Sequence, residues 1–513
     1  LKSINKLKVT DANGQVVIND GDVTINNFDE SDIVVTYVTT RNNFKELIVH
    51  MHNYGNISHT ISNIDINNGL VVLQDEFELT DGEHAVRIVD ISTAEFAETS
   101  VWTISVTWNG NEISGYGGRV NKEIFPIEGW PKGDQCPFPV EGANEENFVI
   151  LRDELHLNTH FFSGACDASK EDVFHAAASS GGEWYVLPAE KFFLEDYTIP
   201  EDAYPGIAAA FVGDESDSNV NKTWDVWNRV LVTRDNTNNR VVTYDGGHSN
   251  HLNGRFAGVS DIQGMDFYVA ACAPHITTWT NPIRIQGAYD YLKNTRENHK
   301  PLTTWMYSQG YCKDCWSVHD LNSGEMLVQL ASVIAAGGKG LMLFESDVRL
   351  QDDDSWKSGG EFLHSIQVVS EFLRQGDIEG ARYTTSANVG DDLILQVVTS
   401  TTGLLVMMIN TKAGGYNSMT CAVSNRHWEF SEQLVSNTSI EIPNDLLRYA
   451  ANDNKALNDY YLMTEIQNGE YIENPSGVSF ELTESSVPMC NIYNVELGST
   501  DTVVRMFLLD VKN

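Results

Sequence analysis

The chain has 513 residues, of which 42% are hydrophobic and 10% aromatic, a composition typical of globular proteins that excludes an intrinsically disordered chain. Its 72 acidic and 33 basic residues give a net charge of −39, which argues against nucleic acid or an anionic membrane as a partner, because both are polyanions. No apolar run reaches the roughly 18 residues that a membrane-spanning helix needs. The length predicts about three domains.

Both ends of the chain alternate apolar and polar side chains in short runs separated by Asn, Gly and Asp. Within residues 1–120 such runs occupy 33–38, 47–51 and 101–108. Within residues 382–513 they occupy 393–398, 404–409 and 503–510. Short alternating runs between turn residues are typical of antiparallel sheets. We therefore expect an N-terminal β-sandwich over 1–120 and a C-terminal β-sandwich over 382–513.

The middle of the chain, residues 121–381, alternates strand patterns with helix patterns. Eight candidate strands occupy 123–127, 159–162, 183–187, 207–212, 240–244, 265–270, 302–307 and 340–344. Helical patterns occupy 146–155, 224–234, 284–296, 326–336 and 361–374. This order predicts an α/β fold, a (β/α)8 TIM barrel. A doubly wound open sheet is the alternative, although no glycine-rich dinucleotide fingerprint follows the first strand.

The fourth predicted strand ends in a cluster of acids. An uncharged run from Ile207 to Val212 is followed by Asp214, Glu215 and Asp217. Active sites of such barrels lie at the carboxyl ends of the strands. Glu215 is the candidate general acid/base, because burial and the neighbouring charge of Asp214 would both raise its pKa. The alternative for Glu215 is a structural salt bridge at the strand end.

A second carboxylate is needed if the site cleaves glycosidic bonds. Strand seven ends in Tyr307 and Gln309 without an acid, so the candidates are Glu345 after strand eight and Asp245 after strand five. Glu345 is preferred because it follows an uncharged apolar strand. A carboxyl separation near 5 Å would indicate retention of anomeric configuration, and roughly 6.5–9.5 Å inversion.

The remaining strand ends are rich in imidazole, indole and polar side chains, the mixture that binds sugar rings. The candidate substrate-binding residues are Trp130, Lys132, His160, Asp217, His248, Asn250, His251, His275, Trp305, Tyr307 and Gln309. We expect no cofactor and no metal. The alternative is a metal-dependent polysaccharide hydrolase or deacetylase in which Asp245, His248 and His251 hold the ion.

Three segments resemble the clan A-like glycoside hydrolases in which a β-sandwich precedes a (β/α)8 barrel and another follows. They are Ile124–Trp130 at the first strand, Phe211–Asp217 at the fourth, and Gln329–Gly340 before the eighth. The resemblance implies Glu215 as the acid/base and a polysaccharide substrate of the agar, porphyran or fucan kind. Two departures stand out: Asp214 replaces the usual Asn, and strand seven lacks the nucleophilic Glu.

The expected function is therefore an endo-acting, retaining glycoside hydrolase with a polysaccharide or oligosaccharide substrate. A non-catalytic carbohydrate-binding protein on a degenerate barrel is the alternative. The seven cysteines allow three disulfides, which suits a secreted or periplasmic protein. The sequence does not decide their connectivity; one arrangement pairs Cys421 with Cys490, Cys136 with Cys166, and Cys312 with Cys315, and leaves Cys272 free.

Overall fold

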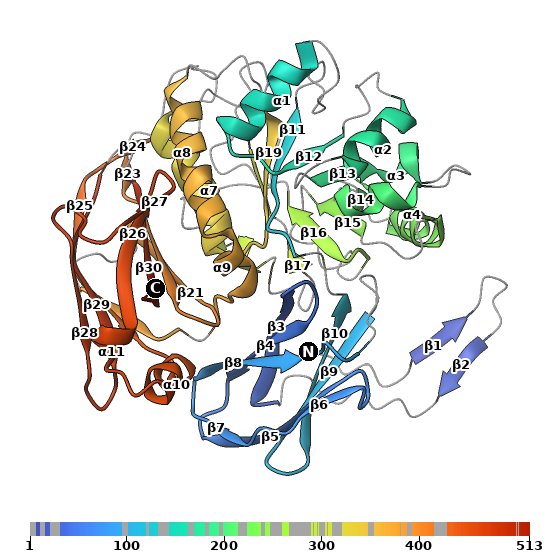
Figure 1. Ribbon diagram of the computed structural model, residues 1–513. Coiled ribbons are helices and arrows are strands. Elements are labelled where there is room, and N and C mark those ends of the chain that lie inside the picture. The colour runs from blue at the N-terminus through green and yellow to red at the C-terminus, as the bar shows by residue number, and fades with distance from the viewer. Residues whose placement is uncertain are drawn as a thin grey trace.

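The computed structural model shows a mixed α/β protein with several sheets (Figure 1). It describes residues 7–10, 16–20, 31–94, 101–119, 123–131, 143–162, 169–179, 184–193, 199–213, 223–236, 242–246, 259–265, 289–290, 292–294, 296, 303–304, 306–309, 321–346, 353–379, 381–386, 392–414, 428–498, 500 and 502–512. None of the described helices is long and apolar enough to cross a lipid bilayer.

The N-terminal part consists of antiparallel sheets. A hairpin comprises β1 (Leu7–Thr10) and β2 (Val16–Asp20). One sheet has the order β3 (Ile33–Arg41), β4 (Glu46–Asn53) and β8 (His84–Asp90). The other has the order β10 (Glu112–Arg119), β9 (Val101–Trp108), β5 (His59–Ile66) and β6 (Val71–Leu73), with β7 (Phe77–Leu79) also paired to β5. Alternate residues of both sheets, including Val49 and Trp102, form one apolar core.

The central sheet is parallel throughout. Its order is β17 (Thr303–Thr304), β16 (Ile262–Met265), β15 (Val242–Gly246), β14 (Ile207–Phe211), β13 (Trp184–Pro188), β12 (Thr159–Phe161), β11 (Ile127–Pro131), β19 (Leu341–Ser346) and β18 (Met306–Gln309). The first and last strands in this order, β17 and β18, are separated along the chain by residue 305 alone. β17 pairs with β16 and β18 pairs with β19.

Most of the predicted central strands are confirmed, but the first is displaced along the chain. The first was predicted at 123–127 and is observed at 127–131. The sixth was predicted at 265–270; β16 covers 262–265, and residues 266–270 lie outside the described residues. Ile124 and Phe125 are buried on opposite sides of the backbone, as in a strand, but the pairing of β11 with its neighbours begins at Ile127. Burial alone therefore misplaced the start of this strand.

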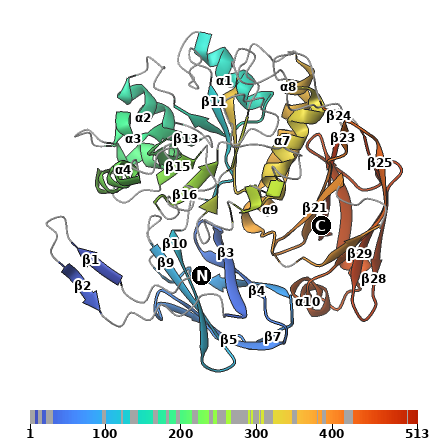
Figure 2. The same ribbon diagram turned by 180° about the vertical axis from the view of Figure 1, so that it is seen from behind.

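Helices follow the central strands and cover the sheet (Figure 2). They are α1 (Ala143–Asp153), α2 (Lys170–Ala178), α3 (Ala189–Phe192), the 3-10 helix η2 (Glu201–Gly206), α4 (Thr223–Asn236), α7 (Ser323–Ala335), α8 (Asp354–Val368) and α9 (Ser370–Gln375). Capping boxes start α2 at Ser169 and α7 at Asn322. The helix predicted at 284–296 is helical at each of its described residues.

The C-terminal part has two main antiparallel sheets. One has the order β20 (Tyr383–Thr385), β25 (Gln433–Glu441), β29 (Met489–Leu497) and β28 (Ser479–Thr483). The other has the order β21 (Leu393–Thr399), β22 (Leu404–Asn410), β30 (Val504–Val511), β26 (Tyr461–Gln467) and β27 (Glu470–Ile472). The short strands β23 (Ala413–Gly414) and β24 (Glu429–Phe430) pair with each other, and two helices, α10 (Asn444–Asn452) and α11 (Leu457–Tyr460), complete this part.

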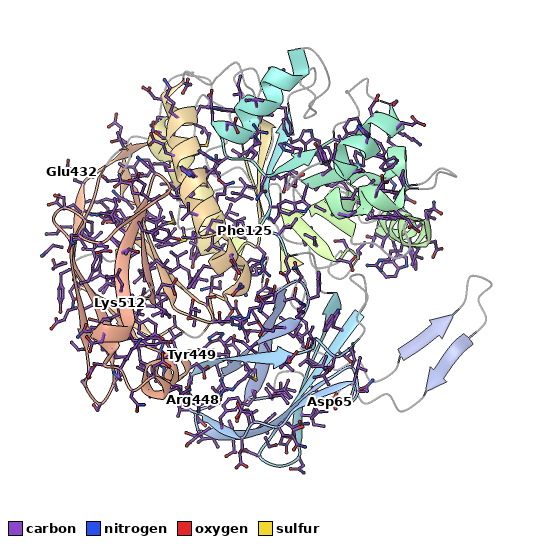
Figure 3. All side chains as sticks on the ribbon, viewed as in Figure 1. Asp65, Phe125, Glu432, Arg448, Tyr449 and Lys512 are labelled. Atoms are coloured by element: carbon purple, nitrogen blue, oxygen red, sulfur yellow. The ribbon has the colours of Figure 1, made fainter. Side chains whose placement is uncertain are left out.

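The sheet containing β22 is buried on both faces. Val406 packs inside the C-terminal core, whereas Leu405 and Met407 join the core that includes α7 and α8. This explains why β22 is continuously apolar although its sheet is antiparallel. The side chains drawn in Figure 3 fill the space between this sheet and α7.

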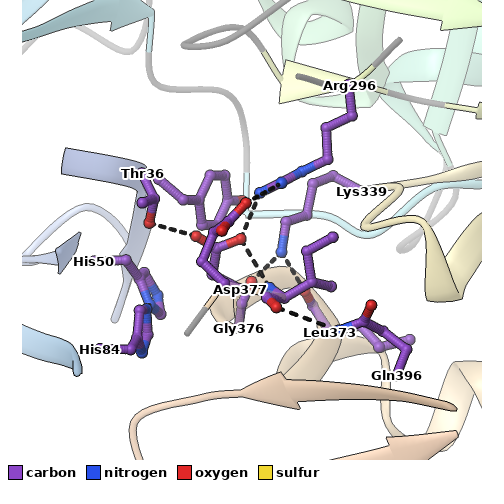
Figure 4. A network of polar contacts seen from close by, with 12 residues as sticks. Thr36, His50, His84, Arg296, Lys339, Leu373, Gly376, Asp377 and Gln396 are labelled. Atoms are coloured by element: carbon purple, nitrogen blue, oxygen red, sulfur yellow. Dashed lines mark hydrogen bonds and ion pairs between the residues drawn. The ribbon is translucent and has the colours of Figure 1, made fainter. Parts of the chain in front are cut away.

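A buried polar network joins the N-terminal sheets to the rest of the molecule (Figure 4). Asp377 accepts hydrogen bonds from Thr36 on β3 at 2.5 Å and from Arg296 at 2.5 Å. Lys339 donates to the carbonyl oxygens of Leu373, at 2.9 Å, and of Gly376. Burial alone would raise the pKa of Asp377, but Arg296 and the other neighbouring cations hold it well below its ordinary value. Residues from three separate stretches of the chain thus share one buried polar network.

Candidate functional site

Three aromatic side chains meet near the carboxyl ends of neighbouring central strands. Trp130 lies at the end of β11, Phe161 at the end of β12 and Phe211 at the end of β14. The ring of Trp130 stacks on Phe161 with centroids 4.1 Å apart and meets Phe211 edge-on at 5.9 Å. We call these three residues the aromatic cluster. Because side chains alternate along a strand, all three project to the face that also holds Ile124 and Ile262.

Glu128 lies on β11 two residues before Trp130, and therefore on the same face of the sheet. Its side chain is 1% exposed, and burial raises its pKa to about 8. Its Oε1 atom has no hydrogen-bond partner among the residues that the structure describes. The site residues predicted from the sequence do not include Glu128, although it stands at the end of the first predicted strand. The alternation from Ile124 through Glu128 to Trp130 was the signal that indicates its inward orientation.

The chain following β14 leads toward the predicted acids. Phe211, Val212 and Gly213 are buried, and β14 lies in the middle of the parallel sheet. Asp214, Glu215 and Asp217 fall outside the described residues. The described backbone therefore brings the chain to the carboxyl edge of the sheet, next to the aromatic cluster, immediately before these acids.

The candidates for the second carboxylate lie at the ends of two other central strands. In β15, Asp245 pairs with Gly264 of β16. Between β11 and β19 the register passes from Trp130 opposite Phe344 to Pro131 opposite Ser346, so Glu345 is an extra residue at this irregularity. Such bulges redirect side chains and are common beside active sites.

The predicted sugar contacts also include His160 on β12 and two residues of β18, Tyr307 and Gln309. In β18, the backbones of Tyr307 and Gln309 pair with Met342 and Phe344 of β19. On β12, His160 is fully buried, and its ring lies 4.8 Å from that of Phe148 on α1 and 5.7 Å from Tyr185. Its neighbour Phe161 faces the aromatic cluster, so alternation turns His160 toward the helices. We therefore do not propose His160 as a sugar contact.

The other predicted contacts, Lys132, His248, Asn250, His251, His275 and Trp305, lie outside the described residues. Within the described part of the chain, no group of three or more His, Cys, Asp or Glu side chains is placed to hold a metal ion.

The disulfide prediction needs one correction. Cys490 is a free thiol, fully buried in the C-terminal core with Ile440 and Ile492. Burial raises the pKa of this thiol to about 12. The arrangement that pairs Cys421 with Cys490 is therefore wrong. The remaining cysteines lie outside the described residues.

No protein-family model matches the chain, and no curated protein matches it. It is similar to a solved cycloisomaltooligosaccharide glucanotransferase from Paenibacillus sp., at 7% identity and a TM-score of 0.42, covering 93% of this chain and 99% of that one. It is also similar to a structure described as a glycoside hydrolase, at 9% identity and a TM-score of 0.44, covering 77% and 94% of the two chains. A third is a glycoside hydrolase family 5 protein from Bacteroides vulgatus ATCC 8482, at 10% identity and a TM-score of 0.43, covering 77% and 90%. These scores are too low to establish a shared fold.

Proposed function

We propose that this protein is a glycoside hydrolase that cleaves internal bonds of a polysaccharide at the carboxyl edge of its parallel sheet. The observation that carries the proposal is the aromatic cluster beside the end of β14, where the chain continues directly into Asp214 and Glu215. A glycosidase needs aromatic surfaces for sugar rings and a pair of carboxyl groups at the same place.

The sheet geometry supports a closed (β/α)8 barrel as the framework. β17 and β18 stand at opposite ends of the strand order but are separated by residue 305 alone, so one continuous strand would connect both ends. In a barrel, the chain following every central strand would converge on one mouth. Glu215, Asp245 and Glu345 would then surround a common space.

In this proposal Glu215 protonates the leaving oxygen and later removes a proton from water. Glu345 is the nucleophile, and Asp245 is the other candidate for that role. The resulting covalent glycosyl-enzyme would give retention of configuration. Trp130 supplies a sugar-stacking surface, held in place by Phe161 and Phe211.

The decisive experiment measures reducing ends released from a panel of marine and plant polysaccharides, including agar, porphyran and fucan. The Glu215→Gln variant should lose about 10²- to 10⁴-fold in kcat, the usual contribution of a general acid. The matched control is Glu201→Gln, because Glu201 is exposed in η2 at the amino end of the same strand. Full activity in Glu215→Gln would refute the assignment. Sugar binding without any release of reducing ends would instead indicate a carbohydrate-binding protein.

We further propose that the protein acts outside the cytoplasm, either secreted or periplasmic. A polysaccharide is too large to cross a membrane, so an endo-acting enzyme meets it outside the cell. Fractionation of the native host tests this: activity confined to the cytoplasm would contradict it.

A further inference from the structure

Glu128 is unusual among the buried carboxyl groups of the described residues. The others have strong partners: Asp261 with Arg234 at 2.8 Å, Glu325 with the backbone N–H of Trp428 at 2.7 Å, Asp377 with Arg296 at 2.5 Å, and Glu465 with Arg505 at 2.6 Å. The Oε1 atom of Glu128 has none. Leaving a buried polar atom without a partner costs about 1–3 kcal/mol, so a purely structural role does not explain why an acid stands here.

The surroundings of Glu128 favour the neutral acid. Its paired neighbours are Thr159 on β12 and Met342 on β19, and both side chains are buried and uncharged. Along the same face, Ile124 lies on one side and Trp130 on the other. Burial raises the pKa of Glu128, and no charged group among the described residues contributes to the shift. His160, the nearest titratable group described on β12, faces the helices instead.

Ionisation of Glu128 would disturb this arrangement in a specific direction. A carboxylate is expensive in an apolar environment and moves toward water. Ile124 is buried, whereas Trp130 is half-buried at the carboxyl edge, so the route to solvent passes Trp130. A charged Glu128 would therefore displace the ring on which we expect a sugar to stack.

We propose that Glu128 is a positioning residue for the sugar-binding site, which as a neutral acid supports Trp130 and on ionisation releases it, weakening the binding of a sugar ring. This inference rests on the proposed function, since it assigns a substrate-binding role to Trp130. It adds a residue and a mode of pH control to the same site.

The test compares kcat and KM of the wild type, Glu128→Gln and Glu325→Gln between pH 6 and pH 10. Gln has the size of the neutral acid and cannot ionise. In the wild type, KM should rise about tenfold per pH unit above about 8, with kcat little changed. In Glu128→Gln this rise should be absent. Glu325→Gln, a change at an equally buried carboxyl outside the site, should keep the wild-type rise. The same rise in Glu128→Gln would overturn the proposal.

A measurement without substrate separates this inference from the proposed function. The fluorescence of Trp130 is obtained as the difference between the wild type and Trp130→Phe across the same pH range. It should change near pH 8, and the matching difference between Glu128→Gln and Glu128→Gln/Trp130→Phe should stay constant. A constant Trp130 signal in the wild type would refute the coupling, even if Glu215 proves to be the acid. Loss of hydrolysis with the fluorescence change intact would refute the proposed function instead.

Discussion

Glu128 and Glu325 show how partners decide what a buried carboxyl group does. Both side chains are at most 1% exposed. Glu325 accepts hydrogen bonds from the backbone N–H groups of Asn322 and Trp428, so it caps α7 and ties it to the segment before β24. The strand neighbours of Glu128, Thr159 and Met342, are buried and uncharged instead. The first carboxyl group stabilises the fold, whereas the second opposes it whenever the solution favours ionisation.

Glu128 should make the protein less stable as the pH rises. Its folded-state pKa of about 8 lies above the unfolded value of 4.5, so between these values the unfolded chain releases a proton that the folded chain keeps. The contribution of Glu128 to the free energy of unfolding is fully present below about pH 4.5. Between about pH 4.5 and about pH 8 it falls by about 1.4 kcal/mol per pH unit. In urea unfolding at pH 5, 6 and 7, the free energy of unfolding of Glu128→Gln should therefore increase relative to that of the wild type at each step.

Glu128→Gln lacks the titrating group, which isolates its contribution from that of every other acid. If the difference between the two proteins stays constant from pH 5 to pH 7, Glu128 does not hold its proton in the folded state. We expect Glu128→Gln to be more stable than the wild type and to lose the pH dependence of sugar binding. This is the trade-off between stability and activity that is typical of a functional residue.

Among the elements, β14 depends on a close contact with α2. Gly206 precedes the strand, and a Cβ atom there would overlap the backbone carbonyl of Ala177. Unlike a flexible side chain, a backbone carbonyl cannot avoid the overlap by changing its rotamer. Gly206→Ala should therefore displace the start of β14 and lower the free energy of unfolding by about 1–3 kcal/mol or more. The displacement would also move the strand end that precedes Asp214.

The control for this prediction is Gly115→Ala on β10, where an added Cβ has no atom within 4 Å. Chemical unfolding should show little change or a small gain for that variant, because alanine restricts the unfolded chain. Equal effects of the two substitutions would contradict the steric explanation. Kinetic assays of Gly206→Ala then test whether the position of β14 matters for activity.

The sequence predicted most of these elements because their signals are local. The strand from Ile207 to Phe211 is a short apolar run between glycines, and α7 begins at a capping box that four residues define. The environment of Glu128 is not local. Its buried neighbours Thr159 and Met342 lie on two other strands, far from it in the sequence, and pair with it only when the sheet forms. For the same reason, the burial of His160 between two layers was not predictable from β12 alone.

At the scale of the whole molecule, the network around Asp377 connects parts that the sequence pattern treats as separate. Thr36, His50 and His84 come from the N-terminal sheet, Arg296 and Lys339 from the middle of the chain, and Gln396 from β21 (Figure 4). Nε2 of His50 donates to the carbonyl oxygen of Gln375 at 2.6 Å. Burial lowers the pKa of His50 to about 3, so this ring is neutral in the folded protein.

Asp377→Asn should lower the free energy of unfolding more than the small change in side-chain size suggests. The amide leaves the buried guanidinium of Arg296 with Glu379, at 3.2 Å, as its remaining described carboxylate, and breaking a buried ion pair from one side costs about 3–5 kcal/mol. The matched control is Asp153→Asn, because the ion pair of Asp153 with Arg152 is largely exposed and worth at most about 1 kcal/mol. Guanidinium unfolding of the two variants measures the difference.

The same variant shows whether the junction makes the molecule one cooperative unit. The N-terminal sheets have a core of their own, so they can remain folded when their contacts with Asp377 are lost. Asp377→Asn should therefore unfold in two steps, and limited proteolysis should cut between the N-terminal and central sheets before either is degraded. If the variant instead unfolds in one transition with the stability of the wild type, apolar contacts and not the charge network hold these parts together. The three sheet groups would then depend on each other through packing alone.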